Sequence, residues 1–124
     1  MVTIGVDAHK RTHTLVVVDE LGRRLSEKTV TTTSDGHLDA LSWAKQWPGR
    51  TFAVEDCRHL TRRLEADLLR AGESVRRVPT HLMASERRAG RLKGKSDPID
   101  ALAVARASLR EPAEPRSARS TGAR

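Results

Sequence analysis

The segment Val2-Thr3-Ile4-Gly5-Val6-Asp7-Ala8 decides the fold class of this 124-residue chain. Apolar side chains alternate along it with small or polar ones, and a period of two residues is typical of a strand. An apolar, β-branched run at 15–18 follows a polar stretch at 9–14, so the two segments predict a hairpin. The first strand carries a carboxylate, Asp7, at its end.

The next segments predict further strands and two helices. Turn residues at 19–22 and a threonine-rich run at 24–33 favour a third antiparallel strand. A helix follows, with Ser34 or Asp35 as its N-cap and a stop at 48–49. A strand at 51–55, a helix ended by Gly72 and a strand at 74–78 imply a right-handed parallel crossover. The expected inner faces are Leu38, Leu41 and Ala44 on the first helix, and Leu60, Leu64 and Leu68 on the second.

A last helix at 97–109 completes the order β-β-β-α-β-α-β-α, with Ile99, Leu102, Ala103 and Leu109 roughly on one side. This α/β order is the architecture of ribonuclease-H-like folds, a mixed sheet with helices on its faces. We expect a single domain over residues 1–110. Residues 111–124 are rich in Pro, Ser, Arg and Ala without an apolar pattern, which predicts a disordered basic tail or linker.

Composition restricts the classes of function. The 23 Lys and Arg against 16 Asp and Glu give a net charge of +7, which indicates a polyanionic partner, nucleic acid above all. Aromatic residues are only 2%, which argues against recognition by stacking many bases. The single cysteine, Cys57, excludes an intramolecular disulfide, and no apolar run reaches the roughly 18 residues of a membrane span. We therefore expect a reduced, cytoplasmic protein with no membrane partner.

Four carboxylates are the candidates for chemistry. Asp7 and Glu55 each end a predicted strand, and both would emerge at the carboxyl edge of the sheet if the two strands are parallel neighbours. Asp97 and Asp100 are three residues apart at a helix start, so they share a face. Such a set suits two Mg²⁺ or Mn²⁺ ions, which at about 3.5–4 Å apart stabilise both the attacking and the leaving oxygen of a phosphodiester.

Each carboxylate also has a purely structural interpretation. Asp97, Pro98 and Asp100 make a strong helix start unaided, because Asp is a preferred N-cap and Pro a preferred first helical residue. Asp7 and Glu55 could each simply close a strand. Only the joint arrangement of all four favours a metal site.

Basic and histidine residues are candidates for contacts to nucleic acid. Residues 81–95 form a basic, partly helical connector, which suits either backbone phosphates or a solvated face. His9 and His13 lack a third soft ligand for zinc, so we expect them at the surface or at phosphates. Cys57 has no catalytic partner pattern and is expected to be a packed thiol. The predicted nucleic-acid-binding residues are Lys10, Arg11, Arg87, Arg88, Arg91, Lys93 and Lys95.

Three segments resemble a known family: IGVDAHK at 4–10, AVEDCR at 53–58 and, above all, GKSDPIDA at 94–101. Over about Val2 to Pro112 the chain resembles the amino-terminal, RuvC-like catalytic domain of the DEDD insertion-sequence transposases, which are related to Piv-type DNA invertases. The resemblance implies that Asp7, Glu55, Asp97 and Asp100 are catalytic and coordinate Mg²⁺ or Mn²⁺. It also implies a bacterial protein that binds DNA, in some members a structured guide RNA, and that forms homo-oligomers at full length.

Two departures from the family pattern qualify this resemblance. Many relatives follow the strand glutamate with a small-residue turn, whereas Asp56-Cys57-Arg58 stands here. Family members also continue into a carboxy-terminal domain with a serine expected to act as nucleophile. We therefore expect a truncated copy, with 111–124 leading toward that missing domain, which does not catalyse strand exchange alone.

Two other functions compete with the transposase interpretation. A non-catalytic basic module would bind RNA or DNA in a salt-sensitive way that is unchanged by substitutions at Asp7 or Asp100. Half of an actin-like ATPase would need a glycine-rich turn after Asp7 to hold phosphates, and no glycine occurs between Asp7 and Gly22.

Overall fold

The predicted strands and helices are present in the predicted order. The computed structural model describes residues 1–55, 58–79, 97–110 and 116–117, so Cys57 and the basic connector at 81–95 lie outside the described residues. The strands are β1 (Val2–Ala8), β2 (Thr12–Val18), β3 (Arg24–Thr31), β4 (Arg50–Glu55), β5 (Ser74–Val78) and β6 (Arg116–Ser117). The helices are α1 (Ser34–Ala44), α2 (Arg58–Arg70) and α4 (Asp97–Arg110).

The strands form one mixed sheet in the order β3-β2-β1-β4-β5-β6. The hairpin pairs β1 antiparallel with β2, and β2 pairs antiparallel with β3. β4 pairs in parallel with β5, which is the crossover expected from the strand-helix-strand order, and β1 pairs in parallel with β4. The two-residue strand β6, antiparallel to β5, lies within the segment predicted as a tail.

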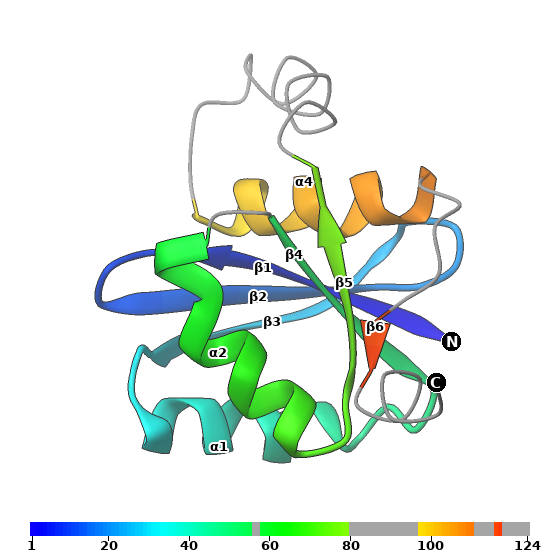
Figure 1. Ribbon diagram of the computed structural model, residues 1–124. Coiled ribbons are helices and arrows are strands. Elements are labelled where there is room, and N and C mark those ends of the chain that lie inside the picture. The colour runs from blue at the N-terminus through cyan, green and yellow to red at the C-terminus, as the bar shows by residue number, and fades with distance from the viewer. Residues whose placement is uncertain (56–57, 80–96, 111–115, 118–124) are drawn as a thin grey trace.

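Helices cover both faces of the sheet. Figure 1 shows α1 and α2 below the sheet and α4 above it. Because successive strand residues point to opposite faces, each strand contributes to two cores. The core under α1 and α2 is the larger and includes Ile4, Leu15, Phe52, Leu64 and Leu68. The core under α4 is built of small residues, among them Ala53, Val16, Ala101 and Ala105.

The glycine in the first strand permits the close approach of α4. A Cβ at Gly5 would overlap the Ala101 carbonyl oxygen and lie 2.6 Å from the Ala105 backbone nitrogen. The helix backbone therefore rests directly on β1. At its other end, Arg106 Nε donates a hydrogen bond to the Gly22 carbonyl oxygen at 3.0 Å, in the β2–β3 turn.

The inner face of α1 differs from the prediction. Ala44 is buried and Leu41 packs against the core as expected, but Leu38 is 60% exposed and His37 and Ala40 are buried instead. Thr33, rather than Ser34 or Asp35, is the N-cap, and its hydroxyl accepts a hydrogen bond from Gly36 N. A Cβ at Gly36 would overlap the Thr31 carbonyl oxygen, so the helix meets β3 backbone to backbone there, which turns His37 inward.

The expected face of α4 is also partly wrong. Leu109 is 41% exposed, whereas Ala101, Val104, Ala105 and Ala107 are buried. The close contact at Gly5 admits only small side chains there, which are Ala101 and Ala105. In α2 the predicted inner residues Leu64 and Leu68 are buried, as expected.

Candidate active site

The pairing of β1 with β4 brings two predicted site residues to neighbouring positions. The parallel register pairs Gly5 with Ala53 and Val6 with Val54, so Asp7 and Glu55 are the next residues along the two strands. Paired parallel strands lie about 4.8 Å apart. Gly5 and Ala53 pack under α4, and side chains alternate in direction, so both carboxylates point to the α4 face at the carboxyl edge.

The start of α4 lies over the same edge. α4 runs antiparallel to β1, and Figure 1 shows its first turn, in yellow, above the arrowhead of β1. Ala101 of α4 packs against Gly5, and Gly5 lies two residues before Asp7 on β1. Asp100, which directly precedes Ala101, therefore lies near the end of β1. Asp100 is partly exposed. Asp97 begins the helix, and its side chain lies outside the described residues.

The structure thus brings Asp7, Glu55 and the first turn of α4 to one edge and one face of the sheet. Within the residues it describes, no group of three or more His, Cys, Asp or Glu side chains is close enough to hold a metal ion. The four-carboxylate site remains a prediction.

A histidine contacts the first of these carboxylates. His9 Nε2 lies 2.6 Å from Asp7 Oδ2, and the Asp7 side chain is 15% exposed. An ionised carboxylate only accepts hydrogen bonds, so His9 is the donor and helps to orient Asp7. His9 therefore belongs to the candidate site, and with its side chain 43% exposed it also lies at the surface, as expected.

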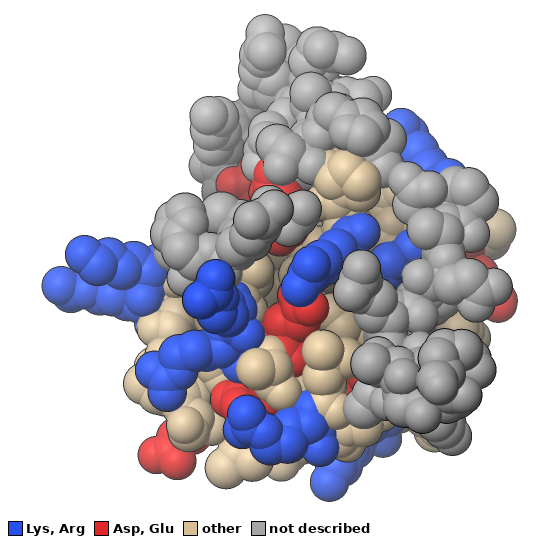
Figure 2. All heavy atoms as spheres, viewed as in Figure 1, with Lys and Arg blue, Asp and Glu red and all other residues tan. Residues whose placement is uncertain are grey.

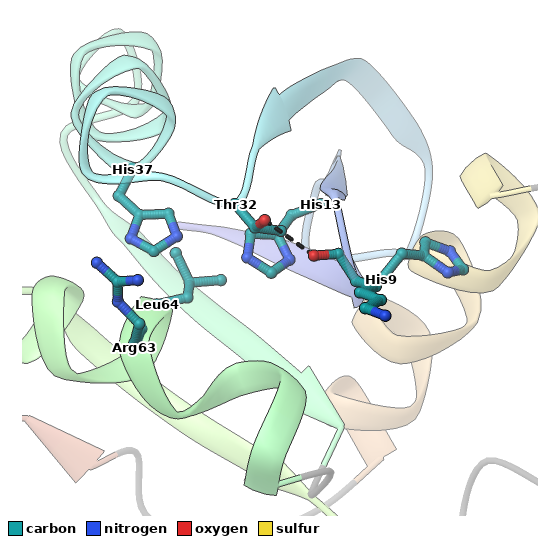
Figure 3. Close-up of a pocket in the computed structure, with 7 residues that line it drawn as sticks. His9, His13, Thr32, His37, Arg63 and Leu64 are labelled. Carbon is teal, nitrogen blue, oxygen red and sulfur yellow. Dashed lines mark hydrogen bonds between the residues drawn. The ribbon is translucent and has the colours of Figure 1, made fainter.

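A pocket of about 530 Å³ opens at the same carboxyl edge, but on the face of the sheet that α1 and α2 cover. It is lined by His9, Lys10, His13, Thr32, His37, Arg63 and Leu64, and Figure 3 shows the His13 and His37 rings side by side within it. His13 is only 1% exposed, so its expected surface position is wrong. Burial, followed by the neighbouring His37 and His9, lowers the pKa of His13 to about 4.

His37 and Arg63 were missed at the sequence level. His37 stands on the expected helix beside Leu38, and the spacing of His37, Ala40 and Ala44 matches a helical face equally well. Arg63 lies in α2 and reaches the pocket only through the packing of that helix on the sheet.

The predicted nucleic-acid contacts divide into two groups. Lys10 and Arg11 are exposed in the β1–β2 turn, and Lys10 lines the pocket. The other five, Arg87, Arg88, Arg91, Lys93 and Lys95, lie outside the described residues.

Further basic residues lie on the surface of the described part of the chain. Figure 2 shows Lys and Arg side chains gathered over α2 with acidic side chains between them. Glu65 of α2 forms an ion pair with Arg77 of β5, with 2.8 Å between Oε2 and Nη2. Arg76 points from β5 toward the α4 face, and its buried Nε and Nη2 atoms have no hydrogen-bond partner in the described part of the chain.

The fold matches that of RuvC. The structure titled "T. thermophilus RuvC in complex with Holliday junction substrate" is 20% identical, with a TM-score of 0.65 over 94% of this chain and 99% of that one. A second structure, titled "Thermus thermophilus RuvC structure", is 18% identical, with a TM-score of 0.68 over 94% of this chain and 100% of that one. At this identity the likeness establishes a common fold of the ribonuclease-H-like class.

The family follows from the sequence itself. A family model for DEDD transposases of the IS110 type, described as "Transposase", matches residues 4–123. The chain belongs to this transposase family, which confirms the resemblance inferred from its motifs and disfavours the actin-like ATPase. No curated protein matches the sequence. Among the described helices, none combines the length and apolar character needed to cross a membrane.

Proposed function

We propose that this domain supplies the acidic, divalent-metal-dependent half of a DNA transposase active site, with Asp7, Glu55, Asp97 and Asp100 as the metal-binding and catalytic residues. The parallel pairing of β1 with β4 carries the proposal, because it makes Asp7 and Glu55 neighbours on the face where α4 begins. The RuvC in the first structural match is bound to a Holliday junction, and we extend DNA as substrate to this chain through its transposase family.

The donor set fits the proposed ion. All four side chains are carboxylates, and Mg²⁺ and Mn²⁺ prefer hard oxygen ligands. When bound, such ions stabilise charge on the attacking and leaving oxygens of a phosphodiester. Carboxylates this close repel one another, so a cation also offsets the cost of gathering them at one edge.

The chain's own residues orient the site and hold the substrate. His9 positions Asp7 through the 2.6 Å hydrogen bond, and the contact of α4 with Gly5 fixes the first turn of the helix against the sheet. Lys10, Arg11, Arg87, Arg88, Arg91, Lys93 and Lys95 contact backbone phosphates, of DNA or of a structured guide RNA. The domain acts in a bacterial cytoplasmic homo-oligomer.

Calorimetric titration with Mn²⁺ tests the proposal. The wild type should bind Mn²⁺ saturably, and Asp7→Asn and Glu55→Gln should each weaken binding by at least about tenfold, since each removes a charged ligand. Glu20→Gln is the matched control: it removes the same charge from the exposed β2–β3 turn, where Glu20 lies 3.9 Å from the chain's amino terminus. Circular dichroism shows that each variant is folded.

Two results would contradict the proposal. One is Mn²⁺ affinity in Asp7→Asn and Glu55→Gln equal to that of Glu20→Gln. The other is a folded wild type that binds no Mn²⁺ while it binds DNA in a salt-sensitive way, which would favour the non-catalytic basic module.

A further inference from the structure

The pocket on the α1 and α2 face contains buried polar atoms without partners. His13 is 1% exposed and His37 is 2% exposed. Within the described chain, His13 Nδ1 and His37 Nε2 are both buried and have no hydrogen-bond partner. A buried polar atom left unsatisfied costs about 1–3 kcal/mol. Both side chains line one pocket, so a ligand bound there is in a position to supply the missing hydrogen bonds.

The His37 ring is held in place for such a ligand. Its Nδ1 atom lies 2.7 Å from Asp67 Oδ2, which leaves Nε2 as the ring nitrogen without a partner in the described part of the chain. The ring stacks on His13 with centroids 5.4 Å apart and an angle of 27° between the planes. Figure 3 shows the two rings from β2 and α1 beside one another, with the Arg63 guanidinium from α2 close by.

The charges of the pocket favour an anion. Lys10 and Arg63 both line it, and none of the described lining residues is acidic. A metal cation would be repelled by these two charges, and no group of three metal-ligating side chains occurs in the described part of the chain. A small tetrahedral anion can instead accept hydrogen bonds from Lys10 and Arg63, from His13 Nδ1 in the neutral tautomer that carries its proton there, and from His37 Nε2 when that ring is protonated.

The pocket is linked to the candidate active site. His9 lines the pocket and also contacts Asp7, so pocket and carboxylates lie at the same edge on opposite faces of the sheet. A nucleic-acid strand that crosses this edge of the sheet would therefore meet both the carboxylates and the pocket.

We propose that the pocket formed by Lys10, His13, Thr32, His37 and Arg63 binds a backbone phosphate of the nucleic-acid strand that the domain holds. The proposal rests on the proposed function for the identity of the strand. It adds a specific anion site, on the face opposite the carboxylates, that orients the strand at the carboxyl edge.

Inorganic phosphate and an oligothymidylate are the two probes, and the readout is nitrogen NMR of the histidine rings in a buffer free of phosphate. Inorganic phosphate should shift the His13 Nδ1 and His37 Nε2 signals saturably, and the oligothymidylate should shift the same signals. Arg63→Gln should weaken phosphate binding at these rings by about tenfold, the usual scale for one charge-assisted hydrogen bond. Arg62→Gln is the control, because Arg62 is the exposed neighbour on the same helix and does not line the pocket.

Three outcomes would overturn the proposal. The ring signals could stay unchanged at saturating phosphate, or Arg62→Gln could weaken binding as much as Arg63→Gln. Phosphate could also bind while the oligothymidylate leaves the rings unperturbed, which would make the pocket a free-anion site. Mn²⁺ titration of Arg63→Gln separates the two proposals, because that variant should keep the Mn²⁺ affinity of the wild type whether or not phosphate binds.

Discussion

Gly5 is the residue on which the docking of α4 depends. Gly5→Ala would place a methyl group against the Ala101 carbonyl and 2.6 Å from Ala105 N, both of them backbone atoms that cannot rotate away. Overpacking of this kind costs about 1–3 kcal/mol and sometimes more, and because both clashing atoms belong to the backbone we expect a loss of about 3 kcal/mol of stability in urea unfolding.

Gly49→Ala is the control for this substitution. The nearest atom to a Cβ at Gly49 is Met1 Cα at 3.6 Å, which is ordinary contact. Its φ is not positive, so stability should change by less than about 1 kcal/mol. Equal stability of Gly5→Ala and Gly49→Ala would contradict the close contact of α4 with β1.

His13 makes the stability of the domain depend on pH. Burial, His37 and His9 lower its pKa from 6.5 to about 4. The unfolded chain therefore takes up this proton at a higher pH than the folded one, so stability is full above pH 6.5 and falls as the pH drops from 6.5 toward 4. The shift corresponds to about 3 kcal/mol.

Urea unfolding of the wild type and of His13→Gln at several pH values measures this effect, in buffers free of phosphate. The wild type should lose stability between pH 6.5 and 4 more steeply than the variant. The other titrating groups are common to both proteins, so the difference between the curves isolates His13. Parallel curves would show that His13 titrates normally in the folded protein; His13→Asn is the second variant if His13→Gln folds poorly.

At the scale of elements, an ion pair joins the start of β4 to the turn before β5. Arg50 Nε and Nη2 donate to Glu73 Oε1 and Oε2 at 2.9 and 2.7 Å, and the two side chains are only 17% and 9% exposed. Glu73→Gln would leave the guanidinium largely buried without its counter-charge, so we expect a loss of about 3 kcal/mol. Thermal or urea unfolding measures it.

The exposed pair of Lys28 with Asp39, 3.4 Å apart, provides the comparison. Asp39→Asn removes the same charge from a side chain that is 56% exposed, and exposed pairs contribute at most about 1 kcal/mol. If Glu73→Gln lost no more stability than Asp39→Asn, the bidentate pair would not be holding β4 and β5 in register.

The elements themselves were largely predictable from local patterns. Period-two alternation in 2–8 and the apolar run at 15–18 identify the central hairpin, and the strand at 74–78 has the predicted bounds. The inner face of α1 was not predictable, because the spacing of its leucines favours Leu38 while the backbone contact of Gly36 with Thr31 selects His37. That contact joins two elements and leaves no periodic signal in the sequence.

At the scale of the whole molecule, the two sites differ in how far the sequence reveals them. Asp7 and Glu55 were predictable as candidates because each ends a strand, but their meeting depended on those strands being parallel neighbours, which the sheet pairing supplies. The phosphate pocket was not, because His13, His37 and Arg63 come from β2, α1 and α2 and meet only after both helices have packed on the sheet. His37 and Arg63 belong to no recognisable motif.

The most direct test of the central claim is to locate bound Mn²⁺ by the paramagnetic broadening of backbone amide NMR signals. At substoichiometric Mn²⁺ we predict that the signals of Asp7, Glu55, Asp100 and Ala101 broaden first, since β1, β4 and the start of α4 meet at one edge. The signal of Glu20, in the β2–β3 turn, should persist. Broadening that begins at Glu20 or at the exposed Asp35 and Asp39 of α1, with Asp7 and Glu55 unaffected, would contradict a metal site at the carboxyl edge.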